Sequence, residues 1–492
     1  VCLEHDLVDA VSQARTSRCS ALCCAAGRRC CPASRRVRPR AALLRAGGEP
    51  WRPAQLPAVT NERRKEFHDY WASAGDQPLL ARDRILAGIC PQLCGLRLAK
   101  LAVALTLAGG VQKSTESGHR TRGQPHLLLI GDPGTGKSQF LRFASRLASR
   151  SVLTTGVGSS AAGLTAAAVR EGGQWALEAG ALVLADGGVC CIDEFNSVGE
   201  RDRTCIHEAM EQQTLSVAKA GLVCKLNTRC SVLAATNPHG KLDTGQSLSV
   251  NTNLASPLLS RFRPRAATTP EDSEDSNESP ANDKENAPTL APAASEPQQQ
   301  QRRQPVWNLE RLQAYFAYAR SINPTIGAEA GAVLTAYYQR QRAATTPDQL
   351  GADRSAARTT TRLLESCIRL AEAHARLMLR PTVSLLDALM AVSVVEASMV
   401  GAALVPGNGR GGGVGVGPLA GFPEQPDAEF AQEARQLLAA LGLHRLLASA
   451  VDGEVGTMIG DAIDAASVIN LSPPGGRPVL ALSRVKSSAP AR

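Results

Sequence analysis

The chain has few aromatic residues, few charges for its length and no long apolar run. Aromatic residues make up 3% and charged residues 20% of its 492 residues, and both shares are low for a chain folded along its whole length. Some of this length is therefore expected to be linker. The longest apolar stretch, 98–110, contains Lys100 and is shorter than the roughly 20 residues that cross a bilayer. The sequence predicts no membrane-spanning helix.

An amino-terminal methionine and a secretory signal are also absent. Val1–Asp6 has no basic start followed by an apolar core, and we expect the chain to be a fragment. The fourteen cysteines include three adjacent pairs. Without a signal leading to an oxidising compartment, they favour a reduced, intracellular setting over a disulfide framework.

Length and charge set two further limits. At roughly 150 residues per domain, the chain has room for about three domains and at least one large core. It carries 54 Lys and Arg against 45 Asp and Glu, which gives a net charge of +9 and a pI near 9.0. This balance favours an anionic partner.

Apolar runs alternate with helical patterns between residues 60 and 262, which predicts an α/β fold with a parallel sheet and helices on its faces. The expected strands are 127–130, 151–153, 189–192 and 231–235. Outside this core we expect five parts: a poorly specified region at 1–59, a disordered acidic and Pro/Gln-rich linker at 263–305, a helical lid at 306–402, a Gly-rich linker at 403–424, and a short helical segment with a tail at 425–492.

A glycine-rich loop follows the first of these strands and opens a helical pattern. It satisfies G-x-x-x-x-G-K-S, the pattern of a phosphate-binding loop, whose backbone N–H groups face phosphate oxygens. Lys137 is expected to reach the β/γ oxygens of ATP and Ser138 to bind Mg²⁺. The predicted nucleotide-binding residues are Gly131, Asp132, Pro133, Gly134, Thr135, Gly136, Lys137, Ser138 and Gln139.

Two further strands end in polar residues. The run 189–192 ends in Asp193 and Glu194, a pair suited to holding Mg²⁺ through Asp193 and orienting an attacking water through Glu194. The alternative is a solvated acidic strand end. Asn237 follows the run 231–235 and is predicted to reach the γ-phosphate or the water, although asparagines at strand ends commonly just begin turns.

Five motifs in order resemble the minichromosome maintenance (MCM) family of AAA+ DNA helicases. They are the phosphate loop, Ile192–Phe195, Glu208–Gln213, Ala234–Pro238 and Leu258–Phe262. Four further segments, 151–156, 189–197, 216–228 and 362–378, are most similar to the ninth-member branch of that family, a recombination and repair type. The resemblance covers roughly residues 60–262 and 306–405. It implies an AAA+ core with a helical lid, an ATP- and Mg²⁺-dependent ring of usually six subunits, and a nuclear location.

The resemblance also assigns two arginines. Arg261 matches the arginine finger that reaches into the next subunit's site, and Arg362 matches a lid arginine that contacts nucleotide across the same interface. From the residues alone, Arg261 is equally a surface arginine, and Arg362 could pair with Glu365 at i+3 on a helix.

Two segments are expected to contact DNA. Thr214–Leu226 reads as strand, turn and strand, and Lys219 beside the turn matches the family's hairpin lysine, which implies a contact with the phosphate backbone of single-stranded DNA. A solvated lysine at a hairpin tip is the alternative. Residues 161–173 match a second pore-lining insert of the family.

Three features depart from the family. Cysteines 19–31 lack the paired C-x-x-C spacing of a zinc module, so no zinc is expected there. Residues 1–59 are expected to be a remnant of the family's amino-terminal oligonucleotide-binding region, in which only 1–10 resemble a piece of that domain, and truncation or a misassembled gene model is the expected cause. After Arg261 and Phe262 we expect the fifth core strand to be absent, which would leave 127–130 as an unpaired sheet edge, weaken ATP hydrolysis and point to a transcript that encodes an apolar strand between Phe262 and Trp307.

These inferences predict an ATP-dependent DNA helicase subunit that translocates on single-stranded DNA in recombination and repair, in a ring with a related subunit. A scaffold subunit that binds ATP and DNA without useful turnover is the alternative. A protein-remodelling AAA+ enzyme is less well supported, because the chain is basic and carries the hairpin lysine.

Overall fold

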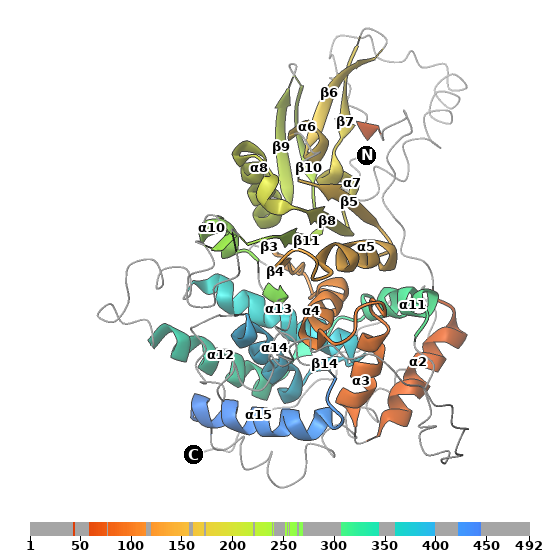
Figure 1. Ribbon diagram of the computed structural model, residues 1–492, viewed down its shortest axis with the longest axis vertical. Coiled ribbons are helices and arrows are strands. Elements are labelled where there is room, and N and C mark those ends of the chain that lie inside the picture. The colour runs from red at the N-terminus through yellow and green to blue at the C-terminus, as the bar shows by residue number, and fades with distance from the viewer. Residues whose placement is uncertain are drawn as a thin grey trace, which may run out of the picture. The chain divides into compact units, whose positions relative to one another are not determined.

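A five-stranded parallel sheet organises the chain, in the order β12-β4-β11-β8-β5. Figure 1 labels four of these strands, β4, β11, β8 and β5. Every neighbouring pair in this sheet is parallel. The predicted α/β fold is therefore confirmed. The strands are β4 (Leu127–Gly131), β5 (Ser151–Thr155), β8 (Val189–Asp193), β11 (Ser231–Thr236) and β12 (Arg265–Thr268).

All described residues belong to the unit Leu43–Arg492. The computed structural model describes residues 43–44, 59–75, 77–114, 120–156, 161–171, 174–219, 222–238, 240, 251–252, 254, 256–262, 265–268, 307–343, 360–398 and 422–443. The predictions for residues 1–42, for most of the linkers and for the tail beyond 443 lie outside these ranges.

The central strands are continuous apolar runs because both faces of the sheet are covered. Leu127 and Leu129 of β4 join a large core with the lid and amino-terminal helices, whereas Leu128 and Ile130 point into a second core on the opposite face. The same alternation holds for β8 and β11. Helix α5 (Lys137–Leu147) packs on the first face, and α8 (Glu200–Gln212) packs on the second.

The expected absence of the fifth core strand is wrong. Strand β12 lies inside the segment assigned to linker and pairs in parallel with β4, with Thr268 beside Gly131. Strand β4 is thus paired on both sides and is not an edge. No apolar pattern marks β12 because it reads Arg-Ala-Ala-Thr, and an edge strand of this length needs only backbone hydrogen bonds to one neighbour.

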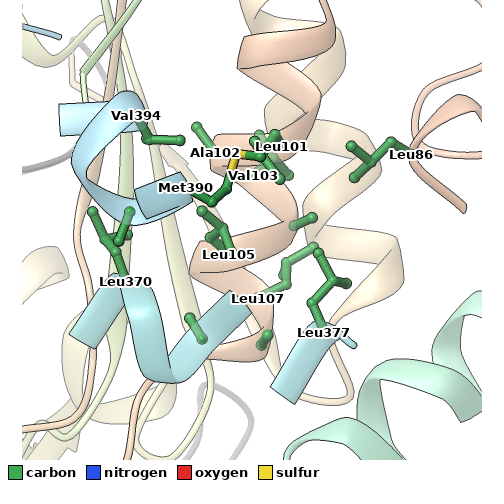
Figure 2. Packing of buried hydrophobic residues seen from close by; sticks show 14 of the residues in the cluster. Leu86, Leu101, Ala102, Val103, Leu105, Leu107, Leu370, Leu377, Met390 and Val394 are labelled. Carbon is green, nitrogen blue, oxygen red and sulfur yellow. The ribbon is translucent and has the colours of Figure 1, made fainter. Parts of the chain in front are cut away.

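Helices from both ends of the chain pack into the larger core. The lid helices α13 and α14 lie against α4, and Leu101 and Leu105 of α4 meet Met390 and Leu370 there (Figure 2). The helices before the sheet are α2 (Asn61–Ala74), α3 (Pro78–Ala87) and α4 (Arg97–Ala108). The lid comprises α11 (Leu309–Ala319), α12 (Ala328–Ala343), α13 (Thr361–Leu377) and α14 (Leu385–Ala397), and α15 (Pro426–Leu441) follows it.

Two antiparallel hairpins are inserted into the core. Strands β9 (Thr214–Lys219) and β10 (Leu222–Asn227) form the predicted strand-turn-strand unit. The segment predicted as a second insert folds as α6 (Ala161–Leu164) and β6 (Ala166–Glu171), and β6 pairs with β7 (Gln174–Ala179). The short elements are β1 (Leu43–Leu44), β2 (Lys113–Ser114), β3 (Arg120–Thr121), α7 (Ala181–Leu184), η1 (Phe195–Ser197), α10 (Ser256–Leu259), β13 (Thr325–Ile326) and β14 (Thr382–Val383).

A buried polar network joins α3 to the lid. His374 Nδ1 lies 2.6 Å from Asp387 Oδ1, and its Nε2 lies 3.2 Å from Nη1 of Arg82, which is fully buried. Since arginine only donates, Nε2 accepts from Arg82 and Nδ1–H donates to Asp387. His374 is therefore neutral, and burial lowers its pKa although Asp387 opposes the shift.

Two expectations concern single helices. Among the described helices, none is long and apolar enough to cross a membrane.

The sequence pattern predicts a carboxy-terminal amphipathic helix at 430–448. Helix α15 instead begins four residues earlier, at Pro426, and ends before Gly442, which lies in the left-handed region (φ 73°).

Candidate nucleotide site

The phosphate loop folds between β4 and α5, as its motif predicts. Gly136 has a φ of 82°, in the left-handed region, and immediately precedes the first residue of α5. A Cβ on Gly136 would stand 2.7 Å from Leu93 Cδ2, because the loop between α3 and α4 covers the phosphate loop. The backbone angle is what favours glycine at 136, and a Cβ there would also push aside the end of the Leu93 side chain.

Lys137 turns back over the loop that precedes it. Its Nζ donates to the carbonyl oxygens of Gly131 (2.7 Å) and Asp132 (2.6 Å) and to the hydroxyl of Thr135 (3.3 Å). Burial lowers the pKa of Lys137, while the nearby charges of Asp132 and Asp193 oppose the shift. A buried ammonium group over the loop is suited to an anionic ligand.

The ends of three parallel strands bring the predicted acidic and amide residues to this loop. Thr236 of β11 is in register with Ile130 of β4, so Asn237 follows β11 at the level where Gly131 begins the loop. On its other side β11 pairs with β8, which ends in Asp193. Lys137, Asp193 and Asn237 therefore lie at one edge of the sheet, as the sequence predicts.

Glu194 follows β8 with an unusual backbone conformation. Its φ is 50° and its ψ is 51°, and it caps the short helix η1. Its N–H donates to Asp193 Oδ1 at 3.0 Å, and its side chain is exposed. Such left-handed geometry costs a residue with a side chain about 1–3 kcal/mol and is common at functional sites.

Arg261 and Arg362 come together on a third side chain. Arg261 Nη2 donates to Glu211 Oε2, and Arg362 Nη2 donates to Glu211 Oε1. Glu365, the expected alternative partner of Arg362, instead accepts from Arg369 at 2.6 Å. The predicted residues thus fall into two contact groups: Asp132 and Asp193 act on the pKa of Lys137 at the phosphate loop, and Arg261 and Arg362 meet at Glu211.

Lys219 is the last residue of β9 and pairs with Leu222 across the hairpin. Its backbone is therefore at the predicted place beside the turn, and its role in DNA contact stays a prediction.

Sequence reasoning missed Leu93 and Glu211. Glu211 belongs to one of the five family motifs, but nothing in a single sequence shows which side chains a helical glutamate meets. It lies 50 positions from Arg261 and 151 from Arg362, so only the fold brings the three together.

ATP and Mg²⁺ fit the phosphate-loop group. The glycine-rich turn and the amino-terminal end of α5 supply N–H groups for phosphates, with Lys137 beside them. Ser138 on α5 and Asp193 on β8 offer the oxygen ligands that Mg²⁺ prefers. Within the described part of the chain, no group of three or more His, Cys, Asp or Glu could hold a metal by itself, and the cysteines at 19–31 lie outside that part.

Comparisons with known proteins agree on one family. Residues 77–279 match the MCM P-loop domain, and residues 310–399 match the MCM AAA-lid domain. A protein of Oryza sativa subsp. indica named "Probable DNA helicase MCM9" is 52% identical over 367 residues, which is 74% of this chain and 52% of that protein. Its Arabidopsis thaliana counterpart is 48% identical over 377 residues, 75% of this chain and 55% of that protein.

A more distant relative has the same family name. "Minichromosome maintenance protein MCM" of Saccharolobus solfataricus is 43% identical over 321 residues, 64% of this chain and 44% of that protein. The chain thus spans about half the length of the curated relatives that it matches. The P-loop match runs on to residue 279 and so includes β12, in agreement with the sheet order.

Proposed function

This chain belongs to the MCM family, and from that premise we propose that it is an ATP-hydrolysing DNA helicase subunit. The observation that carries the proposal is the meeting of the phosphate loop with the polar ends of β8 and β11 at one sheet edge. This arrangement puts a phosphate cradle, a pair of carboxylates and an amide within one site.

Each residue of the phosphate-loop group has its own proposed role in ATP hydrolysis. The loop N–H groups and Lys137 hold the phosphates, and Ser138 and Asp193 hold Mg²⁺, which neutralises phosphate charge when bound. Glu194 accepts a hydrogen bond from the attacking water and orients it toward the γ-phosphate. Asn237 donates from its amide to the γ-phosphate or to the same water.

The arginine group is proposed to complete a neighbouring subunit's site. Arg261 and Arg362 offer guanidinium groups that match phosphate oxygens and stabilise the charge that develops during transfer. Both guanidinium groups are held on the one carboxylate of Glu211, so they can act together.

We propose that the subunit translocates along single-stranded DNA. Lys219 at the tip of β9 supplies a positive charge to the phosphate backbone of single-stranded DNA. We also propose a role in recombination and repair, a nuclear location and a related MCM subunit as ring partner. The similarity to proteins named "Probable DNA helicase MCM9" supports this finer assignment.

The test is steady-state ATP hydrolysis and strand unwinding by the purified chain, alone and with a related subunit. Lys137→Ala should weaken ATP binding and abolish hydrolysis, because it removes contacts to the phosphates. Glu194→Gln should keep ATP bound but abolish turnover, because an amide cannot polarise the water. Undiminished turnover in Glu194→Gln would remove that residue from its proposed role.

The scaffold alternative predicts a different result. In a subunit that binds ATP and DNA without useful turnover, neither variant would lose ATP hydrolysis, because the wild-type chain would already lack it in every assembly. Lys137→Ala would still weaken ATP binding.

A further inference from the structure

Glu211 stands between the two arginines proposed to act on a neighbouring nucleotide. Each of its carboxylate oxygens accepts a hydrogen bond from one guanidinium, Oε2 from Arg261 and Oε1 from Arg362. Arg362 Nη1 also donates to the hydroxyl of Ser260 at 3.2 Å. Because Ser260 precedes Arg261, the lid helix α13 is tied to the turn that carries Arg261 at two points.

The carboxylate of Glu211 offsets the repulsion between the two guanidinium groups that it binds. The Arg261 side chain is 10% exposed, that of Arg362 is 33% exposed, and the shared carboxylate is 46% exposed. Two guanidinium groups brought this close repel each other unless an anion lies between them. Partial burial by itself would raise the pKa of Glu211, but Arg261 and Arg362 outweigh it and lower the pKa, so Glu211 stays ionised at neutral pH.

The position of Glu211 is fixed by its helix. Glu211 lies in the last turn of α8, one turn after Glu208, whose Oε1 accepts from the backbone N–H of Ser216 in β9 at 3.0 Å. Thr228 N–H closes the base of the same hairpin on the carbonyl of Gln213 at 2.9 Å. The end of α8 therefore connects the β9–β10 hairpin to the arginine pair through two carboxylates.

We propose that Glu211 is a positioning residue that presents Arg261 and Arg362 as one unit to the nucleotide of the adjacent subunit. The inference rests on the proposed function of the ring. Guanidinium groups bind a carboxylate and a phosphate through the same kind of planar contact. The carboxylate of Glu211 can therefore hold Arg261 and Arg362 in an arrangement that also suits the phosphates of the neighbouring nucleotide.

The first test compares catalytic constants in the assembled wild-type and variant rings. Glu211→Gln keeps the size and an acceptor oxygen of the side chain but removes its charge. Displacement of a catalytic group by about 1 Å costs about 100-fold in rate, so we expect kcat to fall about 10- to 100-fold. KM for ATP should change less than about twofold, because the phosphate loop is untouched. Glu211→Asp, which keeps the charge, should recover part of the loss.

Subunit mixing shows on which side of the interface Glu211 acts. In a mixed ring, the intact phosphate loop of a Glu211→Gln subunit can meet the intact arginines of a Glu194→Gln subunit. The mixture should therefore hydrolyse ATP faster than either variant alone. No gain on mixing, or an unchanged kcat in Glu211→Gln, would overturn the proposal.

Glu365 offers a matched control. It is 45% exposed and pairs with Arg369 on the same lid helix. Glu365→Gln removes one carboxylate–arginine pair of nearly equal exposure without touching Arg261 or Arg362. We expect its kcat to stay within about twofold of wild type, and a loss equal to that of Glu211→Gln would overturn a specific role for Glu211.

Arginine modification tests the bridge without relying on ATP hydrolysis. Phenylglyoxal reacts with guanidinium groups, and mass spectrometry resolves the modified residue. Glu211→Gln should raise the modification rate at Arg261 and Arg362 but not at Arg369, whereas Glu365→Gln should do the reverse. Unchanged rates at both arginines in Glu211→Gln would overturn the proposal. If the wild-type chain hydrolyses no ATP in any assembly, the proposed function has failed, while these rates still decide whether Glu211 holds the pair.

Discussion

A Cβ on Gly156 would stand 2.3 Å from the carbonyl oxygen of Glu194, so the ends of β5 and β8 approach this closely only because residue 156 is glycine. The Gly156 N–H also donates to the carbonyl of Asp193 at 2.7 Å. Gly156 therefore contacts the backbone of both acidic residues at once, and the second of them, Glu194, has the left-handed conformation.

Gly156→Ala should force these strand ends apart. Overpacking of this kind costs about 1–3 kcal/mol of stability, and the displacement falls on the residue proposed to orient water. We expect kcat for ATP hydrolysis to fall at least about tenfold while ATP binding is retained, because Lys137 and its loop are not displaced. Hydrolysis assays, a fluorescent ATP analogue and urea unfolding measure these quantities.

Gly331→Ala provides the control. Gly331 lies in α12, and a Cβ there meets nothing within 4 Å. Alanine should stabilise that helix by up to about 1 kcal/mol and leave hydrolysis unchanged. A Gly156→Ala chain that is destabilised but keeps the wild-type kcat would show that the contact is structural only.

Lys219→Ala should weaken binding of single-stranded DNA for all sequences alike. Each phosphate contact that is lost lowers the slope of log affinity against log salt by about 0.7, so the slope should fall by about that amount per contacting subunit, with basal ATP hydrolysis nearly intact. Lys225→Ala is the matched control, because Lys225 is an exposed lysine of the same hairpin, paired with Ser216 nearer its base. Equal salt slopes for wild type and Lys219→Ala in an assembled ring would favour a solvated lysine.

The elements whose pattern is local could be predicted from the amino-acid sequence. Strands β4, β8 and β11 are apolar runs because both faces of the sheet are buried. Strand β8 ends in Asp193, and Asn237 follows β11. The phosphate loop follows from its own spacing, because its glycines and Lys137 stand at fixed intervals between a strand and a helix.

The parts that escaped prediction depend on contacts between distant segments. Strand β12 has no apolar pattern, and its identity comes from pairing with β4 across more than a hundred residues. Glu211 accepts hydrogen bonds from arginines of α13 and of the turn after α10, and Leu93 from another loop lies against Gly136. Contacts of this kind, between segments far apart in the chain, cannot be predicted from a single sequence.

The neutral, buried His374 predicts a loss of stability in mild acid. Its pKa is lowered by burial in the folded chain and is about 6.5 when the chain is unfolded. Below pH 6.5 the unfolded chain takes up a proton that the folded chain refuses, so the free energy of unfolding falls by up to about 1.4 kcal/mol per pH unit. Above pH 6.5 neither state is protonated there, and the effect vanishes.

His374→Gln isolates this contribution. The variant should be less stable at pH 7.5, because the bonds to Arg82 and Asp387 are disturbed, but its stability should fall less steeply between pH 6.5 and 5.5. Groups that do not contact His374 contribute equally to both chains, including Glu433, whose pKa burial raises to about 7 and whose effect has the opposite sign. Urea unfolding at three pH values measures the difference, and identical slopes would mean that His374 does not titrate as proposed.

Strand β12 provides the last prediction, because its pairing places Thr268 beside Gly131, the first residue of the phosphate loop. Proline has no N–H to give to a sheet ladder, and neighbouring residues of a strand point their N–H groups in opposite directions. Replacing both Ala266 and Ala267 by proline therefore removes at least one bond to β4, whichever residue donates it.

The double proline variant should be less stable by about 1–3 kcal/mol, because a buried backbone group of β4 loses its partner. It should also bind ATP more weakly, since β4 then becomes the edge that carries the phosphate loop. Replacing the same two alanines by serine keeps both N–H groups and should leave ATP affinity within about twofold of wild type. If the proline variant binds and hydrolyses ATP as the wild type does, β12 does not support the loop, and the core functions with four strands.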